Sequence, residues 1–351
     1  MTKKPNKATE LLLLNYVVDE NDSIFSHQAQ ILKKLSHHFS SVYVFTNHLG
    51  LFECPDNVNI FVVPWTPKRR LLNVLRFVYK IYPFLIFKRN LVVFSHMTEV
   101  KSFLIFPITK ILKIKHYLWY AHASKSKYLK FLRIGITGFI TSTSGSFPFS
   151  FNNLYAIGQS IDPVQFPYLE RNSFPLKKFV HIGRLDPSKN IEELIDTVLS
   201  LNKCGQNMSL TFIGKPSASN DSYYLNSIKT KYDDFITEGT IKFLGSISRD
   251  LISFRLSQFD VFIHAFEGSL DKVLVEATFT GIPVITSNQE YIKSFGSWAL
   301  NYLDLNSEIL AFKRMSLEEI KEKQNSRLRF ALMNHNMDNW IAKLISILKA
   351  A

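Results

Sequence analysis

The chain has 351 residues, of which 46% are hydrophobic, and its 42 Lys and Arg against 29 Asp and Glu give a net charge of +13. This composition excludes a disordered or collagen-like chain, and the length suits two globular domains. No stretch approaches the roughly 20 apolar residues of a membrane span, and the N-terminus lacks the features of a signal peptide. With only two cysteines, the sequence favours a cytoplasmic protein.

Strand-like and helical segments alternate along the first half of the chain. Helical spacing predicts a helix over residues 25–38, and apolar runs predict strands at 11–17, 41–46, 59–63, 91–94, 116–121 and 138–141. Such alternation favours a parallel sheet covered by helices.

A second alternation begins near residue 177, after a proline-containing segment that indicates a linker. Predicted strands lie at 179–182, 210–213, 241–244, 261–264 and 284–286, with helices at 191–201, 221–231, 249–257 and 271–280. We therefore expect an α/β protein with two doubly wound, Rossmann-like domains. Such domains bind ligands in a cleft at the carboxyl ends of their strands.

The first chemical signal is the segment Gly183-Arg184-Leu-Asp-Pro-Ser-Lys189-Asn190, which follows a predicted strand. Glycine at a strand end lets a ligand approach the backbone, and Arg with Lys suits a diphosphate. Asn190 is predicted to cap the next helix, with Glu193 as its reciprocal partner. The alternative is a surface loop with two solvated cations, and spacing alone leaves both interpretations open.

The second signal lies between the strands at 261–264 and 284–286. Its central residue, Glu276, is about one turn inside a helix, where a carboxylate can accept two hydrogen bonds from a ribose diol. The alternative is an ion pair of Glu276 with Lys272 on a solvated face. The start of this helix offers free backbone amides to a phosphate, and its residues are Gly268, Ser269, Leu270, Asp271 and Lys272.

Together these segments resemble the GT-B glycosyltransferases of family 4, which are retaining and use nucleotide sugars. The Gly-Arg-x4-Lys-Asn pattern ends at Asn190, and Glu276-Ala-x3-Gly-x-Pro-Val matches a second family segment. The resemblance implies a GT-B fold, in which two Rossmann-like domains face a cleft. It also implies that Gly183, Arg184 and Lys189 meet the donor diphosphate and that Glu276 binds the ribose.

The resemblance extends over most of the chain. In Trp119-Tyr-Ala-His122-Ala-Ser, His122 stands where the family has a His near the transferred sugar, although a structural His is the alternative. His96 ends a neighbouring predicted strand, and Asp22 and Ser23 lie where the family's first loop approaches donor and acceptor. The implied organisation is an acceptor-binding domain over 1–160, a linker over 161–176, a donor-binding domain over 177–335, and a helix over 336–351 that crosses back to the first domain.

One departure concerns the family's first Glu, which usually stands eight residues before the second. Gly268 occupies that position here, and Glu267 is displaced by one residue. Either the variant loop contacts the sugar through its backbone amides and Asp271, or activity is reduced. A non-catalytic GT-B subunit that binds nucleotide or glycan is therefore the alternative function.

Positive charge is concentrated between Lys68 and Arg133, where 15 basic residues stand against a single acid, Glu99. One helical face there is apolar and lies beside cations, which suits an anionic membrane surface. Its apolar residues are Leu71, Leu72, Leu75, Val78 and Tyr79. A core helix with a solvated basic edge is the alternative, and both stay open. Nucleic acid is not expected, because no RNA- or DNA-binding motif accompanies the charge. The predicted membrane-facing residues are Lys68, Arg69, Arg70, Arg76 and Lys80.

We also expect no metal ion and no other cofactor. Two acidic clusters, Asp19 with Asp22 and Asp233 with Asp234, lack the strand-end context of a metal site. Arg184 with Lys189 can instead neutralise a departing diphosphate. The sequence thus predicts a glycosyltransferase on the inner face of the membrane. It would move a hexose from a UDP- or GDP-sugar to a glycan or lipid-linked acceptor in cell-surface polysaccharide or glycolipid synthesis.

Overall fold

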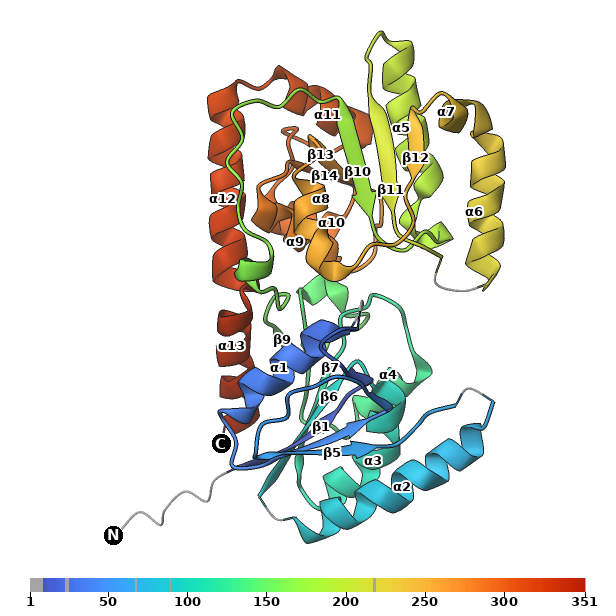
Figure 1. Cartoon of the computed structure of the whole chain (residues 1–351). Coiled ribbons are helices and arrows are strands. Elements are labelled where there is room, and N and C mark those ends of the chain that lie inside the picture. Colours follow the sequence, from blue (N-terminus) through green and yellow to red (C-terminus); the bar gives the residue numbers. More distant parts are fainter. Residues whose placement is uncertain (1–8, 23–24, 67, 89, 217–218, 351) are drawn as a thin grey trace. The chain divides into compact units, whose positions relative to one another are not determined.

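The computed structural model describes residues 9–22, 25–66, 68–88, 90–216 and 219–350. The chain divides into two compact units, one formed by residues 1–158 with 337–351 and the other by residues 159–336 (Figure 1). The boundary at 158 lies close to the expected one at 160. The segment 161–176, expected to be a linker, lies within the second unit.

The first unit is built on a seven-stranded parallel sheet with the order β5-β3-β1-β6-β7-β8-β9. The order runs outward on both sides from β1 and β6, as in a Rossmann fold. The strands of the unit are β1 (Glu10–Leu14), β2 (Val17–Val18), β3 (Val42–Thr46), β4 (His48–Leu49), β5 (Val58–Val62), β6 (Leu91–His96), β7 (Lys115–Trp119), β8 (Gly138–Thr141) and β9 (Leu154–Ala156). Its helices are α1 (Ser26–Ser36), α2 (Arg70–Phe87), α3 (Glu99–Ile111), α4 (Lys127–Leu132), η1 (Ser144–Ser146) and α13 (Met337–Lys349).

Alternate residues of β1 face opposite sides of this sheet, as the period of a strand requires. Leu11 and Leu13 pack with residues of α1 and α13, whereas Leu12 and Leu14 pack with residues of α2 and α3. Helices therefore cover both faces, which explains why β1 is apolar at four successive positions.

The second unit repeats this design with the sheet order β12-β11-β10-β13-β14. One face packs on α5 and α11, and the other on α9 and α10. Its strands are β10 (Lys178–Ile182), β11 (Ser209–Ile213), β12 (Ile241–Phe243), β13 (Val261–His264) and β14 (Val284–Thr286). Its helices are η2 (Pro163–Gln165), η3 (Pro187–Lys189), α5 (Ile191–Lys203), α6 (Ser219–Lys231), α7 (Asp233–Thr237), η4 (Arg249–Leu251), α8 (Ile252–Leu256), α9 (Lys272–Thr280), α10 (Gln289–Phe295), α11 (Leu305–Arg314) and α12 (Leu317–His335). The predicted α/β class with two Rossmann-like domains is confirmed.

Helix α2 buries one face and leaves a second apolar face exposed. Asn73, Phe77, Ile81 and Leu85 are buried at intervals of four residues. The apolar face that the sequence places beside the cations lies on the other side of the helix. Its most exposed side chains are Leu71 at 73%, Leu75 at 59% and Tyr79 at 83%.

The last helix, α13, belongs to the first unit although it follows the second in the chain. Its Trp340 packs edge-on against Trp119 of β7, with ring centroids 5.1 Å apart. The two chain segments that join the units run side by side in the second unit. Gln159 N donates to His335 Nδ1 at 2.8 Å, and Ile161 N donates to the His335 carbonyl at 2.9 Å.

Candidate functional site

The strand order of the second unit reverses between β10 and β13, and ligands of doubly wound sheets bind at the carboxyl ends of such strands. Gly183 directly follows β10 there, and its N–H donates to Ile213 O at 3.0 Å. The neighbouring Gly214 has φ +149°, and a Cβ on it would lie 1.8 Å from Gly183 O. Only glycine fits at 214, so the backbones of two adjacent strand ends approach closely at this edge.

The two predicted phosphate-binding cations have different surroundings. Arg184 leaves 54% of its side chain exposed, with Nη1 3.4 Å from Asp186 Oδ2. The Lys189 side chain is buried, pairs with Asp271, and has its ammonium 3.9 Å from the centroid of the Phe266 ring. Arg184 is thus an accessible cation, whereas the charge of Lys189 is balanced within the protein.

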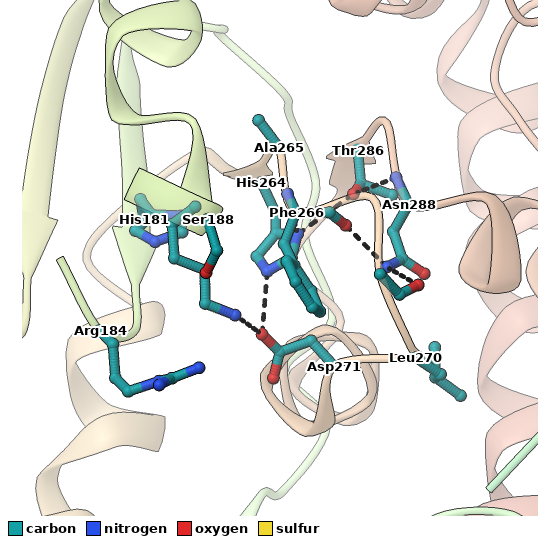
Figure 2. Close-up of polar contacts among 12 residues, drawn as sticks. His181, Arg184, Ser188, His264, Ala265, Phe266, Leu270, Asp271, Thr286 and Asn288 are labelled. Atoms are coloured by element: carbon teal, nitrogen blue, oxygen red, sulfur yellow. Dashed lines mark hydrogen bonds and ion pairs between the residues drawn. The ribbon is translucent and has the colours of Figure 1, made fainter. Parts of the chain in front are cut away.

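Behind this pair lie two buried histidines on adjacent strands. His264 ends β13 and has Nε2 3.2 Å from Asp271 Oδ2 (Figure 2). His181 of β10 stacks against His264 with ring centroids 5.4 Å apart, and its Nδ1 donates to Ile263 O at 3.1 Å. Burial lowers the pKa of both rings, that of His181 to about 3. Both histidines are therefore neutral at physiological pH.

The segment between β13 and α9 is shaped by two asparagines. The buried Asn288 donates to Phe266 O at 2.7 Å and Ser269 O at 3.1 Å (Figure 2). Asn190 donates to Ala265 O at 3.0 Å. The expected capping role of Asn190 is wrong, because its φ of 49° is left-handed and its side chain makes no cap hydrogen bond to α5. The Asn190 side chain instead holds this loop through its hydrogen bond to Ala265 O.

Glu276 lies inside α9 and is only 3% exposed. Its Oε1 pairs with the Arg249 guanidinium, which comes from the segment after β12 and lies 5.6 Å from the Phe166 ring centroid. The alternative interpretation, a solvated ion pair between Glu276 and Lys272, does not describe this site. Burial lowers the pKa of Lys272 to about 7, and Arg249 acts in the same direction.

The predicted start and end of this helix agree with the structure. Asp271 is the residue before α9, so Gly268, Ser269 and Leu270 form the approach to it. A Cβ on Gly268 would lie 2.2 Å from the Phe266 ring, so a larger residue there would require the Phe266 side chain to shift. At the other end, Gly281 adopts φ +77° and terminates α9.

The predicted sugar-proximal residues belong to the first unit. His96 ends β6, is buried, and has its ring centroid 6.1 Å from that of Trp119. His122 follows β7 in an exposed segment, with its ring 5.8 Å from Tyr120. Asp22 accepts a hydrogen bond from Phe25 N at 2.7 Å, and Ser23 lies outside the described residues. Their roles toward a sugar stay predictions.

A buried lysine lies at the corresponding edge of the first sheet. Lys101 of α3 is 3% exposed and donates from Nζ to Asn15 O at 3.1 Å, directly after β1. Burial lowers the pKa of its ammonium to about 7. Lys101 Nζ also lies 5.9 Å from the centroid of the Phe77 ring in α2.

The sequence reasoning did not identify three residues of the site as contributors, namely Arg249, His264 and Asn288. Each acts through a partner 7 to 27 residues away, across a loop or between neighbouring strands. For His264, the sequence offered one signal, which was a His at a predicted strand end seven residues before Asp271. For Arg249, nothing in local spacing pointed to Glu276.

The site combines two buried ion pairs, one accessible cation and the start of a helix, a set suited to a ligand with anionic and hydroxyl groups. Among the described residues, no group of three His, Cys, Asp or Glu could hold a metal ion. Over the same residues, no helix is long and apolar enough to cross a membrane. Lys68, Arg69, Arg70, Arg76 and Lys80 are all exposed on or beside α2.

The match to a known protein family lies within the second unit. Residues 171–295, which include Arg184, Lys189, Asp271 and Glu276, match the family model described as glycosyl transferases group 1. No curated protein sequence matches the chain significantly.

Solved structures match nearly the whole chain. HepE from Anabaena in complex with UDP and glucose has 14% identity and a TM-score of 0.74, covering 98% of this chain and 100% of its own. Sucrose-phosphate synthase from Thermosynechococcus elongatus has 14% identity and a TM-score of 0.73, covering 97% and 98%. The lipopolysaccharide outer core galactosyltransferase WaaB has 12% identity and a TM-score of 0.68, covering 96% and 98%. These similarities confirm the predicted GT-B fold.

Proposed function

We propose that the protein transfers a hexose from a UDP- or GDP-sugar, because residues 171–295 match the family model for glycosyl transferases group 1 and the chain has a GT-B fold. The main support for this proposal is that the residues expected to bind the diphosphate and the ribose lie at the same edge of one sheet. Arg184 follows β10, Lys189 pairs with Asp271, and Glu276 lies one turn into the helix that Asp271 precedes.

In this proposal, the donor diphosphate contacts Arg184 and Lys189, and the ribose hydroxyls donate to Glu276. Negative charge develops on the leaving diphosphate, and two cations fixed before the reaction stabilise it. Gly183 leaves room for the phosphate beside the backbone. Proximity of His122 to the transferred sugar and retention of configuration rest on the family resemblance.

Nucleotide binding tests the donor site. Wild-type protein is titrated with UDP, GDP and ADP by calorimetry, and turnover is then measured with the matching nucleotide sugars. We expect Arg184→Ala to weaken binding of the preferred nucleotide about tenfold or more, because it removes a charge-assisted contact. Lys178→Ala is the matched control, since this exposed lysine starts the same strand at the opposite end. Equal affinity of both variants would refute the assignment.

A non-catalytic subunit is the second candidate, favoured by Gly268 in the position of the family's first Glu. It predicts nucleotide binding without hydrolysis or transfer from any donor. Measurable release of free sugar from one nucleotide sugar rules it out, whereas binding without turnover across the panel favours it over the enzyme.

For the acceptor, we propose a glycan or lipid-linked molecule at an anionic membrane surface, in cell-surface polysaccharide or glycolipid synthesis. The support is helix α2, which exposes Leu71, Leu75 and Tyr79 beside Arg76 and Lys80. Apolar side chains flanked by cations suit the headgroup region of an anionic bilayer. The protein would then be peripheral on the inner face of the membrane.

Vesicle flotation tests this surface with phosphatidylcholine alone and with added phosphatidylglycerol. Arg76→Gln/Lys80→Gln should weaken binding to the anionic vesicles roughly thirtyfold, at about 1 kcal/mol per basic residue. Nucleotide affinity should not change. Lys177→Gln/Lys178→Gln, which removes two exposed charges from the second unit, is the control. Equal flotation of the two variants would contradict the membrane proposal.

A further inference from the structure

The protonation of His264 follows from its hydrogen bonds. Nδ1 lies 3.4 Å from Phe266 N and 3.4 Å from Thr286 Oγ1 (Figure 2). A backbone N–H can only donate, so Nδ1 accepts and the proton of the neutral ring is on Nε2. His264 therefore donates from Nε2 to Asp271 Oδ2, and the ring has no other orientation that keeps both contacts.

Asp271 receives two donors on the same oxygen. Lys189 and His264 both contact Oδ2, one as a cation and the other as a neutral donor. Although burial opposes ionisation, Lys189 and His264 hold the pKa of the Asp271 carboxyl well below its usual range. The buried carboxylate is therefore charged, and it neutralises Lys189.

This counter-charge matters for an anionic ligand. A diphosphate in contact with Lys189 also lies near the Asp271 carboxylate, which repels it, and a partly buried site screens that repulsion weakly. The charge available to the ligand is then mainly that of Arg184. Nucleoside diphosphate, which is a product of sugar transfer, is consequently held less tightly than two uncompensated cations would hold it.

We propose that Asp271, positioned by the hydrogen bond from His264, is the counter-ion of the phosphate-binding Lys189 and limits the affinity of the site for nucleoside diphosphate. His264 is a positioning residue in this arrangement, since it acts through Asp271. The inference rests on the proposed function, because it assumes that the diphosphate contacts Lys189.

The surrounding elements supply the groups that face Asp271. Lys189 comes from η3, His264 from β13, and His181 of β10 lies behind His264. On its own side, α9 contributes Lys272 and Glu276, the latter paired with Arg249. The donors to the carboxylate are Lys189 and His264, so removing the His264 donor should raise the Asp271 pKa.

The test is calorimetric titration with UDP, or with GDP if the wild type prefers it. Asp271→Asn removes the charge while keeping the shape, and should tighten binding about tenfold. Unchanged or weaker binding by this variant would overturn the proposal. If the wild type binds no nucleoside diphosphate at all, the proposed function fails instead, so the two failures are distinguishable.

The role of His264 is tested by its pH dependence. His264→Phe should make UDP binding tighten at a higher pH than in the wild type as the pH is lowered, because the Asp271 carboxylate has lost one of its two donors and takes up a proton more readily. His264→Gln should retain wild-type affinity by supplying an N–H donor near the same place. The double variant His264→Phe/Asp271→Asn should lose the extra pH dependence, and its persistence there would refute the role of His264.

His181→Phe is the matched control for the aromatic substitution. His181 is as buried as His264 and stacks on it, but it bonds to Ile263 O and does not contact Asp271. This variant should keep the wild-type pH dependence of UDP binding. A pH dependence like that of His264→Phe would mean that any disturbance of the strand pair produces the effect, and would overturn the assignment.

Discussion

Replacing Lys101 by Met tests the energetics of the buried ammonium in the first unit. Lys101 is 3% exposed, and its Nζ has a carbonyl partner, Asn15 O, at 3.1 Å. In the unfolded chain its pKa is that of an ordinary lysine, 10.5, whereas burial lowers it to about 7 in the folded protein. Folding therefore favours the neutral amine.

The sign of the effect follows from proton counting. Between about pH 7 and 10.5 the unfolded state binds one proton more than the folded state, so Lys101 makes stability rise with pH. The difference of 3.5 pKa units between these values corresponds to about 5 kcal/mol at about 1.4 kcal/mol per unit. Below pH 7 the full penalty is present, because the ammonium must be buried with its charge. Met removes this penalty, although it also loses the hydrogen bond to Asn15, which is worth about 1–3 kcal/mol.

Urea unfolding of the wild type and Lys101→Met, followed by circular dichroism at pH 6 and pH 9, measures the prediction. The free energy of unfolding of Lys101→Met minus that of the wild type should be about 3 kcal/mol higher at pH 6 than at pH 9. Lys110→Met, at an exposed position of the same helix, should keep a constant offset. A constant offset for Lys101→Met as well would refute the reasoning.

Three further substitutions test the second unit. Gly214→Ala should destabilise the fold by at least about 3 kcal/mol in urea unfolding, because a Cβ there would lie 1.8 Å from Gly183 O. Arg249→Met should cost about 3–5 kcal/mol by leaving Glu276 charged and buried, and adding Glu276→Leu should recover much of that loss in a double-mutant cycle. Asn288→Ala should cost about 1–3 kcal/mol, seen as a lower Tm, because two loop carbonyls lose their donor.

The sheets were predictable because buried parallel strands are apolar at nearly every position, as residues 11–14 and 261–263 are. The edge that holds Gly183 and Arg184 was predictable too, since strand ends of a doubly wound sheet gather on one side. These features depend on residues close together in the sequence, where periodicity and glycine placement have direct structural meaning.

The pairing of charges was not predictable from spacing. Lys189 and Asp271 are 82 residues apart, and they meet because β10 and β13 are neighbours in the sheet. Which face of α2 is buried stayed open in the sequence, because the helix is apolar on more than one side. Asn73 also occupies a buried position, where it donates to Thr66 O at 2.6 Å, and a polar residue gives no hydrophobic signal.

The return of α13 to the first unit has a consequence for how the protein is made. The core of that unit includes Trp340, Ile341 and Leu344, which are synthesised after the whole second unit. Until they emerge from the ribosome, β7 lacks its tryptophan partner, and apolar surface that α13 will cover remains open to solvent. The core of the first unit can therefore be completed only after the second unit has been synthesised. The second unit can form its own core before that point.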